Sequence, residues 1–156
     1  MGVEIEKKFL PASEAWRRLA SPTAYRQGYV ATAEQRTVRV RTVGDTGYLT
    51  IKGPSTGAAR LEFEYQIPYR DALDLLAHLC DRPLIEKNRY EVEYRGFTWE
   101  IDEFFGENEG LVVAEIELES EDQHFEIPDW IGKEVTGDPR YFNACLAKNP
   151  YCRWKK

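Results

Sequence analysis

Charged and apolar residues alternate along most of this sequence, and that period of two restricts its fold more than any other feature. Successive side chains of a β-strand point to opposite faces, so an alternating segment is typical of a strand with one polar and one apolar face. Turn residues separate several of these segments, for example at Gly44, Gly53-Pro54 and Arg95-Gly96. Eight strands are predicted, at about residues 3–10, 24–31, 36–43, 47–53, 60–68, 84–94, 97–104 and 111–119.

Three other segments have helical patterns. Residues 13–20 begin with Ser13 as a helix cap. Residues 70–80 carry an apolar stripe at helical spacing. Residues 139–148 follow Asp138, which is placed to cap them. Eight strands with short connections predict a mainly β (α+β) fold, an eight-stranded antiparallel barrel, closed or nearly closed, with a few peripheral helices. The whole chain, 1–156, is expected to form a single domain.

Ionic residues occupy one face of nearly every predicted strand, and apolar residues occupy the other. Glu4, Glu6 and Lys8, for example, share a face, while Val3 and Ile5 lie on the opposite one. The same assignment along the chain collects basic and acidic residues on a single face. They are Lys8, Arg39, Arg41, Lys52, Lys87 and Arg89, together with Glu4, Glu6, Glu62, Glu64, Glu100, Asp102, Glu115 and Glu117.

Two interpretations of this ionic face remain open. The solvated face of an antiparallel sheet is often charged. Like charges, however, recur here as same-face neighbours such as Glu4/Glu6 and Arg39/Arg41, about 7 Å apart by strand geometry. Each such pair costs about 0.6 kcal/mol in water and about 2.4 kcal/mol at an effective dielectric of ~20. On an enclosed face, divalent cations would neutralise the glutamates and a polyanion would neutralise the basic residues, which together describe a metal-bound polyphosphate.

The remaining chemistry is consistent with a phosphate chain. Carboxylate oxygens suit Mg²⁺ or Mn²⁺, Arg and Lys bind phosphate, and phosphoryl transfer requires no histidine. Two isolated histidines and three cysteines without metal-ligand spacing argue against a zinc site, and there is no Walker A loop. The net charge of −6 argues against a nucleic-acid partner, and the absence of a long apolar run argues against a membrane protein. The odd number of cysteines suggests reduced thiols and a cytoplasmic location.

An ordered series of motifs resembles the CYTH family, also called triphosphate tunnel metalloenzymes. Glu4-Ile5-Glu6-Lys7-Lys8 fits the ExExK signature that opens this family. The resemblance spans essentially the whole chain and includes the closing residues 134–143. The intervening motifs, in family order, are Arg39-Val40-Arg41, Thr50-Ile51-Lys52, Glu62-Phe63-Glu64, Glu86-Lys87-Asn88-Arg89-Tyr90, Glu100-Ile101-Asp102 and Glu115-Ile116-Glu117.

The resemblance implies an eight-stranded antiparallel barrel that forms a tunnel, with the ionic face lining its interior. The apolar face would then lie outside and need helices or a second subunit to cover it, and a homodimer is one way to do so. Family members hydrolyse inorganic triphosphate, hydrolyse thiamine triphosphate or cyclise ATP, all with divalent metal, and the short bacterial members are usually inorganic triphosphatases. The resemblance therefore implies an Mg²⁺- or Mn²⁺-dependent enzyme that cleaves tripolyphosphate to pyrophosphate and phosphate.

The resemblance also implies individual roles within the ionic face. Tyr29 matches a tyrosine proposed as a proton acceptor, with simple hydrogen bonding as an equal alternative because an ordinary tyrosine titrates at about 10. Lys8 is the second candidate catalytic residue. The implied metal-site residues are Glu4, Glu6, Glu115 and Glu117, supported by Glu62, Glu64 and Asp102, and the implied phosphate-binding residues are Lys8, Arg39, Arg41, Lys52, Lys87 and Arg89.

The sequence departs from the family pattern at two places. Phe142 stands where close relatives often carry Lys, so the closing helix is expected to contribute less charge. Gly53 and Pro54 offer no aromatic residue of the kind that recognises thiamine, which argues against thiamine triphosphate. Inorganic triphosphate remains the expected substrate, with thiamine-triphosphatase or adenylate cyclase activity as the enzymatic alternatives. A non-catalytic polyphosphate- or nucleotide-binding module, and a β-sheet interaction domain with a solvated ionic face, are the alternatives from other classes.

Overall fold

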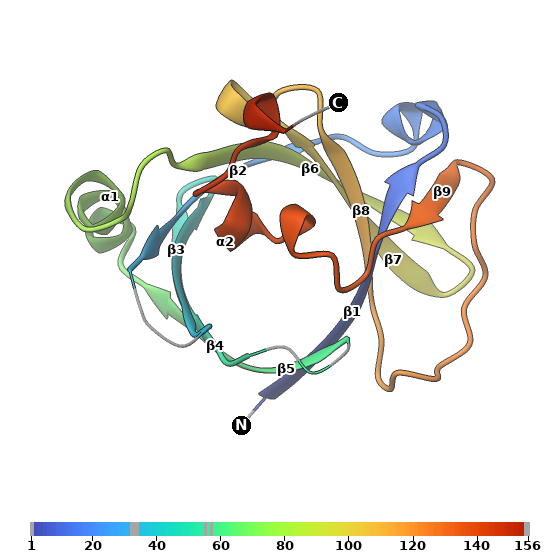
Figure 1. Cartoon of the computed structure of the whole chain (residues 1–156), viewed down its shortest axis with the longest axis horizontal. Coiled ribbons are helices and arrows are strands. Elements are labelled where there is room, and N and C mark those ends of the chain that lie inside the picture. The colour runs from blue at the N-terminus through green and yellow to red at the C-terminus, as the bar shows by residue number, and fades with distance from the viewer. Residues whose placement is uncertain (1, 32–34, 55, 57, 155–156) are drawn as a thin grey trace.

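Nine strands form one antiparallel sheet across the residues that the computed structural model describes, which are 2–31, 35–54, 56 and 58–154. The strand order is β5-β4-β3-β2-β6-β7-β8-β1-β9, and a further pairing of β5 with β1 closes eight of these strands into a barrel. Figure 1 looks through the resulting ring. The strands are β1 (Gly2–Pro11), β2 (Thr23–Val30), β3 (Thr37–Val43), β4 (Thr46–Lys52), β5 (Ala59–Ile67), β6 (Ile85–Tyr94), β7 (Phe97–Phe104), β8 (Val112–Glu117) and β9 (Ile131–Glu134).

Strand β1 closes the barrel because its two halves pair with different neighbours. Residues 2–5 pair with β5, and residues 6–9 pair with β8. The end of β1, from Phe9 to Pro11, pairs with β9, which lies beside the ring in Figure 1. The predicted eight-stranded antiparallel barrel is confirmed, with one short strand added to it.

The hairpin between β6 and β7 shows how a local sequence fixes the register of the ionic residues. Tyr94 pairs with Phe97, so Arg95 and Gly96 alone form the turn. Both residues have positive φ angles, 50° and 85°, as a type I′ turn requires. Glycine adopts this conformation without steric cost, and the turn matches the twist of the strands that it joins. This two-residue turn therefore determines which side chains of β6 and β7 stand opposite each other.

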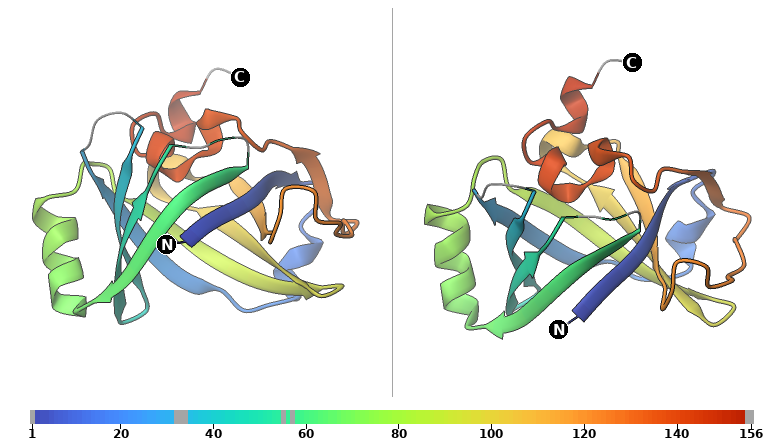
Figure 2. Two further views of the ribbon diagram at one scale, coloured as in Figure 1. Left: turned by 90° about the horizontal axis from the view of Figure 1, so that it is seen from below. Right: turned by 60° about the horizontal axis from the view of Figure 1, so that its bottom comes forward.

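The apolar face of the barrel points outward and is covered by helices and loops. Helix α1 (Tyr69–His78) packs on β3 and β4, where Leu76 joins Val40 in a buried cluster, and Figure 2 shows the helix alongside these strands. A second, aromatic cluster surrounds Trp99, whose ring meets that of Trp130 edge-on at a centroid distance of 6.0 Å. The hydrophobic core thus lies around the barrel and leaves its interior to polar groups.

The predicted helix at 70–80 is confirmed as α1, whereas the one predicted at 139–148 is divided. Its first part is a 3₁₀ turn, η3 (Pro139–Tyr141), in which the Asp138 carboxylate accepts from the backbone N–H of Arg140. Its second part is a short helix, α2 (Asn143–Leu146). The backbone of Phe142 is extended (φ −72°, ψ 131°) and separates the two parts. Residues 135–148, here called the closing segment, lie across the opening of the ring in Figure 1.

Two other regions also differ from the prediction. Residues 13–20 contain only one 3₁₀ turn, η1 (Ala15–Arg18). Strand β9 was not predicted, because its four residues are too few to show a period of two and it forms by pairing with the end of β1. The described part of the chain also holds two more 3₁₀ turns, η2 (Gly106–Asn108) and η4 (Tyr151–Arg153). None of the helices in that part is long and apolar enough to cross a lipid bilayer.

Replacing Leu76 by alanine tests whether α1 stabilises the barrel through its buried face. Leu76 is 1% exposed, so Leu76→Ala leaves a cavity and should lower the free energy of unfolding by about 2–4 kcal/mol. Leu79→Ala is the matched control, since Leu79 is 62% exposed and its truncation should cost less than about 0.5 kcal/mol. Denaturant unfolding of both variants measures the difference, and equal losses would contradict the packing described here.

Candidate active site in the barrel interior

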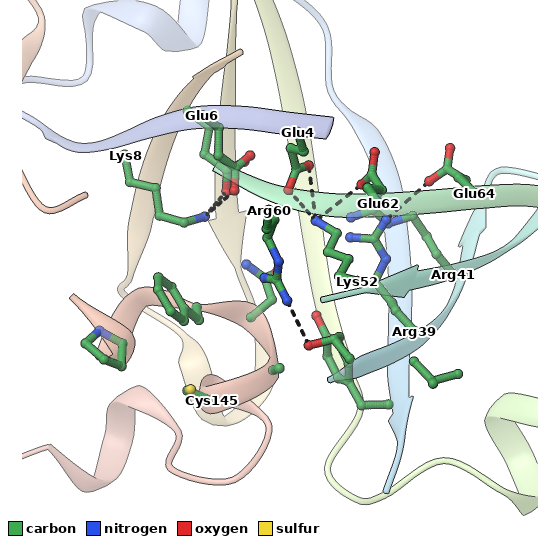
Figure 3. A pocket seen from close by; sticks show the side chains of 18 of the residues that line it. Glu4, Glu6, Lys8, Arg39, Arg41, Lys52, Arg60, Glu62, Glu64 and Cys145 are labelled. Carbon is green, nitrogen blue, oxygen red and sulfur yellow. Dashed lines mark hydrogen bonds and ion pairs between the residues drawn. The ribbon is translucent and has the colours of Figure 1, made fainter. Parts of the chain in front are cut away.

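Ionic side chains from seven of the barrel strands, with Tyr29 from β2, line one cavity of about 730 Å³ inside the barrel. Period-two alternation explains this arrangement, because the same residues that oppose the outer apolar face must point inward. Figure 3 shows a part of the cavity with its carboxylates and cations facing one another. Of the sequence-predicted candidates, the cavity is lined by Glu4, Glu6, Lys8, Tyr29, Arg39, Arg41, Lys52, Glu62, Glu64, Lys87, Arg89, Glu115 and Glu117, and Glu100 also lines it.

Strands β1 and β8 form a wall in which Lys8 holds two carboxylates. The Lys8 Nζ atom lies 2.7 Å from Glu115 and 3.4 Å from Glu6, and Lys8 and Glu115 are both buried. Burial alone would raise the pKa of Glu115, but the charges of Lys8 and Arg89 outweigh it and hold that pKa well below its ordinary value. Glu6 differs, because burial and the neighbouring Glu115 raise its pKa to about 7 in spite of Lys8. Carboxyl groups therefore outnumber cations in this part of the wall.

Lys52 links three strands, β4, β1 and β5, beside this wall. Its Nζ atom donates to both carboxylate oxygens of Glu4, at 2.9 and 3.1 Å, and lies 3.4 Å from Glu62. Burial and the negative charge of Glu4 raise the pKa of Glu62. A single ammonium thus lies between carboxylates of β1 and β5, at the seam where the barrel closes.

A hydroxyl group takes part in the next ion pair along the wall. The Arg39 Nη2 atom donates to Thr50 Oγ1 at 3.1 Å and lies 3.3 Å from Glu64, and the Thr50 hydroxyl donates to the same carboxylate at 2.9 Å. Thr50 is fully buried. These contacts fix the guanidinium of Arg39 in one orientation at the cavity surface.

Asp102 differs from the other acidic candidates because it lies beneath two cations and does not line the cavity. Its carboxylate accepts from Arg89 Nε and Nη2 at 2.8 and 2.9 Å and from Lys87 Nζ at 2.7 Å. Burial opposes its ionisation, but Arg89 and Lys87 lower its pKa to about 2. Both oxygens are engaged by cations, so this carboxylate is placed to orient Lys87 and Arg89.

Gln27 connects the barrel wall with the closing segment. Its side chain is fully buried, and its Nε2 donates to the Tyr29 hydroxyl at 2.7 Å and to Asn143 Oδ1 at 3.3 Å. Its Oε1 accepts from Arg41 Nε at 2.9 Å, and Asn143 Oδ1 also accepts from Lys87 Nζ at 2.9 Å. Two neutral amides therefore hold two cations and a tyrosine in place.

Tyr29 lies at the cavity surface with its hydroxyl fixed by Gln27. Burial raises the pKa of Tyr29 above its ordinary value, although the positive charges of Arg39 and Arg41 oppose the rise. Because the hydroxyl oxygen accepts from Gln27, its own proton is available to a group in the cavity.

The strand alternation contains a signal for most of the site residues that the sequence prediction did not include. Gln27 lies two residues before Tyr29, Thr50 two before Lys52, and Arg60 two before Glu62, so each shares the inner face of its strand. Asn143 has no such signal, because the irregular closing segment and not a strand brings it to the site.

Comparison with known proteins agrees with this geometry. The sequence profile of the CYTH domain matches residues 2–142. This chain belongs to the CYTH domain family. A protein of Acetivibrio thermocellus named inorganic triphosphatase is 57% identical over the full length of both chains. A protein of Nitrosomonas europaea with the same name is 36% identical, covering 92% of this chain and 96% of the relative. A crystal structure of an inorganic triphosphatase superposes with a TM-score of 0.66 at 34% identity, covering 92% of this chain and 96% of the other.

This CYTH chain has carboxylate oxygens of the kind that bind a hard divalent cation, but those that the structure describes do not converge on one point. Within residues 2–31, 35–54, 56 and 58–154, no three Asp, Glu, His or Cys side chains converge closely enough to hold a metal ion. Glu6 and Glu117 are nevertheless direct partners across β1 and β8, and burial and nearby carboxylates raise the pKa of both. Crowded carboxylates in a confined space are the donors that Mg²⁺ and Mn²⁺ prefer, so these residues fit such an ion.

Gln27→Leu tests the amide that links Arg41, Tyr29 and Asn143. The substitution leaves buried polar groups without their partners and should lower the free energy of unfolding by about 2 kcal/mol. Gln66→Leu on β5 is the matched control, because Gln66 is exposed and its replacement should have little effect. Denaturant unfolding compares the two variants, and a stable Gln27→Leu protein would show that the network contributes little.

Proposed function

We propose that this CYTH protein hydrolyses inorganic triphosphate, releasing pyrophosphate and phosphate, in the interior of its barrel. The observation that carries the proposal is the enclosure of the six sequence-predicted cations, among other basic residues, and a set of carboxylates in one cavity. A charged interior cannot serve as a hydrophobic core. Its cations and carboxylates do complement the charges of a metal-bound triphosphate. Full-length relatives named inorganic triphosphatase support the same conclusion. We expect the single domain predicted for residues 1–156 to carry out this reaction.

The six cations would bind the oxygens of the phosphate chain. They approach the cavity from different strands, so a linear chain can be held along its length, with Arg as a bidentate donor and Lys as a point charge. Asp102 is assigned to orienting Lys87 and Arg89, since its own oxygens are occupied by them. The proposed phosphate-binding residues are Lys8, Arg39, Arg41, Lys52, Lys87 and Arg89.

The carboxylates that line the same cavity would hold the metal. Glu6, Glu115 and Glu117 lie on the paired strands β1 and β8, with Glu4 on the same face of β1, and Glu62 and Glu64 lie across the seam on β5. When bound, Mg²⁺ or Mn²⁺ would neutralise phosphate charge and help to position the attacking water. Lys8 and Lys52, the present partners of Glu115 and Glu4, would move their charge toward phosphate as the substrate enters.

Tyr29 is proposed to act as a hydrogen-bond donor to the substrate or to water. The resemblance to the family implies a proton acceptor, but the raised pKa keeps the phenol protonated at neutral pH. The bond from Gln27 occupies the oxygen and leaves the proton free to donate, which favours the alternative role. Lys8 is the cation that would assist most directly at the metal-site wall, since it lies between Glu6 and Glu115.

Location and assembly are parts of the same proposal. A cytoplasmic location is supported by three cysteines that form no disulfide with one another.

A homodimer would cover an apolar strip that the helices leave open on the outside of β1, β4 and β5. The exposed side chains of this strip, each at least 42% exposed, are Val3, Ile51, Leu61 and Tyr65. Light scattering in solution measures the mass directly.

Phosphate release from tripolyphosphate tests the proposed reaction. The wild-type protein should release phosphate with Mg²⁺ or Mn²⁺ and stop when a chelator is added. Glu6→Gln removes one of the crowded carboxylates and should lower the metal-dependent rate by about 100-fold, while raising the metal concentration needed for half-maximal activity. Glu134→Gln, at an exposed position of β9, is the matched control. If the wild-type protein releases no phosphate with either metal, the proposal fails.

A substrate panel and a denaturant-unfolding experiment separate the alternatives. We expect faster turnover of tripolyphosphate than of thiamine triphosphate, and no cyclic AMP from ATP. A non-catalytic module would bind without turnover. Tripolyphosphate with metal, at 100 times its dissociation constant, should stabilise the folded protein by about 2.7 kcal/mol, as measured by denaturant unfolding. A sheet with a merely solvated ionic face would show no such gain.

A further inference from the structure

Arg60 also lines the cavity, and it is not among the six proposed phosphate-binding residues. It lies on β5 two residues before Glu62 and so shares the inner face, and it stands opposite Glu4 across the seam with β1. Its Nε atom donates to the carbonyl oxygen of Gly53 at 3.0 Å, and its Nη2 atom donates to Thr37 Oγ1 at 3.1 Å. Figure 3 shows the side chain reaching from β5 into the cavity, toward the closing segment.

The partners of Arg60 leave its positive charge without neutralisation. Lys8, Lys52 and Arg89, for example, each have a carboxylate within 3.4 Å. Among the described residues, no carboxylate oxygen lies within 4.0 Å of Arg60, and its two hydrogen bonds are both to neutral oxygens. Two of its five N–H groups fix its orientation, which leaves the others for an incoming anion. A fixed guanidinium with free donors is arranged to bind a phosphoryl group.

The surroundings of Arg60 concentrate positive charge at one mouth of the cavity. Lys148 and Cys145 of the closing segment line the cavity with it. Burial raises the pKa of the Cys145 thiol, and the positive charges of Lys148 and Arg60 oppose that rise. Both cations are therefore close enough to Cys145 to act on it electrostatically. The chain as a whole has a net charge of −6, so a local basic mouth is needed to attract a polyanion.

We propose that Arg60 binds a terminal phosphoryl group of the substrate at this mouth, with Lys148 adding positive charge beside it. The inference rests on the proposed function and adds a further phosphate-binding residue to it. The ligand class is a phosphoryl group of a linear phosphate chain, which the guanidinium meets as the chain enters or lies along the cavity.

Arg60→Gln tests this assignment through substrate affinity. Loss of a charged hydrogen bond should raise the KM for tripolyphosphate by about 10-fold, with a smaller effect on kcat. Arg60→Lys retains the charge and should recover part of the affinity, and Lys148→Gln should raise KM by about two- to threefold because Lys148 is exposed. Lys133→Gln, an exposed charge on β9 that does not line the cavity, is the control for net charge.

Salt dependence and melting temperature distinguish a binding role from a structural one. The KM of the wild-type protein should rise with ionic strength more steeply than that of Arg60→Gln, which a purely structural contact would not cause. An unaltered KM in Arg60→Gln overturns the inference, as does a KM change that Lys133→Gln reproduces. If Arg60→Gln melts at a lower temperature, Lys148→Gln still tests the mouth, because an exposed lysine can be replaced without disturbing β5.

A binding measurement keeps this inference separate from the proposed reaction. Calorimetric titration of tripolyphosphate into the wild-type protein and into Arg60→Gln requires no turnover. If the wild-type protein releases no phosphate but Arg60→Gln binds tripolyphosphate more weakly than it does, the proposed reaction is contradicted and the role of Arg60 as a phosphate ligand is supported. If the two proteins bind tripolyphosphate equally well, the role of Arg60 is contradicted and the proposed reaction is unaffected.

Discussion

Burial of charge inside a closed sheet is the constraint on which the rest of this structure depends. An ion in a confined interior loses hydration worth several kcal/mol, and a partner must offset that loss. Here the partners come from different strands: Lys8 meets Glu115 between β1 and β8, Lys52 meets Glu4 between β4 and β1, and Arg89 meets Asp102 between β6 and β7. Since a one-residue slip would turn each of these side chains to the outer face, strand register and charge pairing depend on each other.

The same constraint explains why the hydrophobic core surrounds the barrel. With the interior given to ions, apolar burial has to occur between the outer face and whatever covers it. Helix α1 covers β3 and β4, while the connections that carry Trp16 and Trp130 cover the aromatic cluster around Trp99. The short helices and long connections therefore supply stability to a sheet whose inner face supplies the candidate chemistry.

Sequence alone could predict the barrel and most of the candidate site because both follow from the period of two. Alternation assigns each strand residue to a face whatever its partners, so residues such as Arg39 and Glu115 could be placed on one shared face before any contact was known. Only the resemblance to the CYTH family implied that this face lines the interior. Pairing partners could not be predicted, because they depend on turn lengths and register. Asp102 shows the consequence: alternation places it on the inner face, but Arg89 and Lys87 cover it. Asn143 and β9 lie beyond this reasoning, since neither has a periodic pattern.

The contrast between paired and unpaired cations suggests how substrate and metal binding are linked in the proposed reaction. Lys8 and Lys52 hold Glu115 and Glu4, so these carboxylates are not free donors until the ammonium groups find other partners. Phosphate oxygens are such partners, and each ammonium that turns to phosphate leaves a carboxylate able to hold a cation. Arg41 is different, because its Nε atom donates to the neutral Gln27 and, in the described part of the chain, it forms no ion pair with a carboxylate. Arginines held by neutral groups can attract the phosphate chain first, and the lysines can then exchange carboxylate for phosphate.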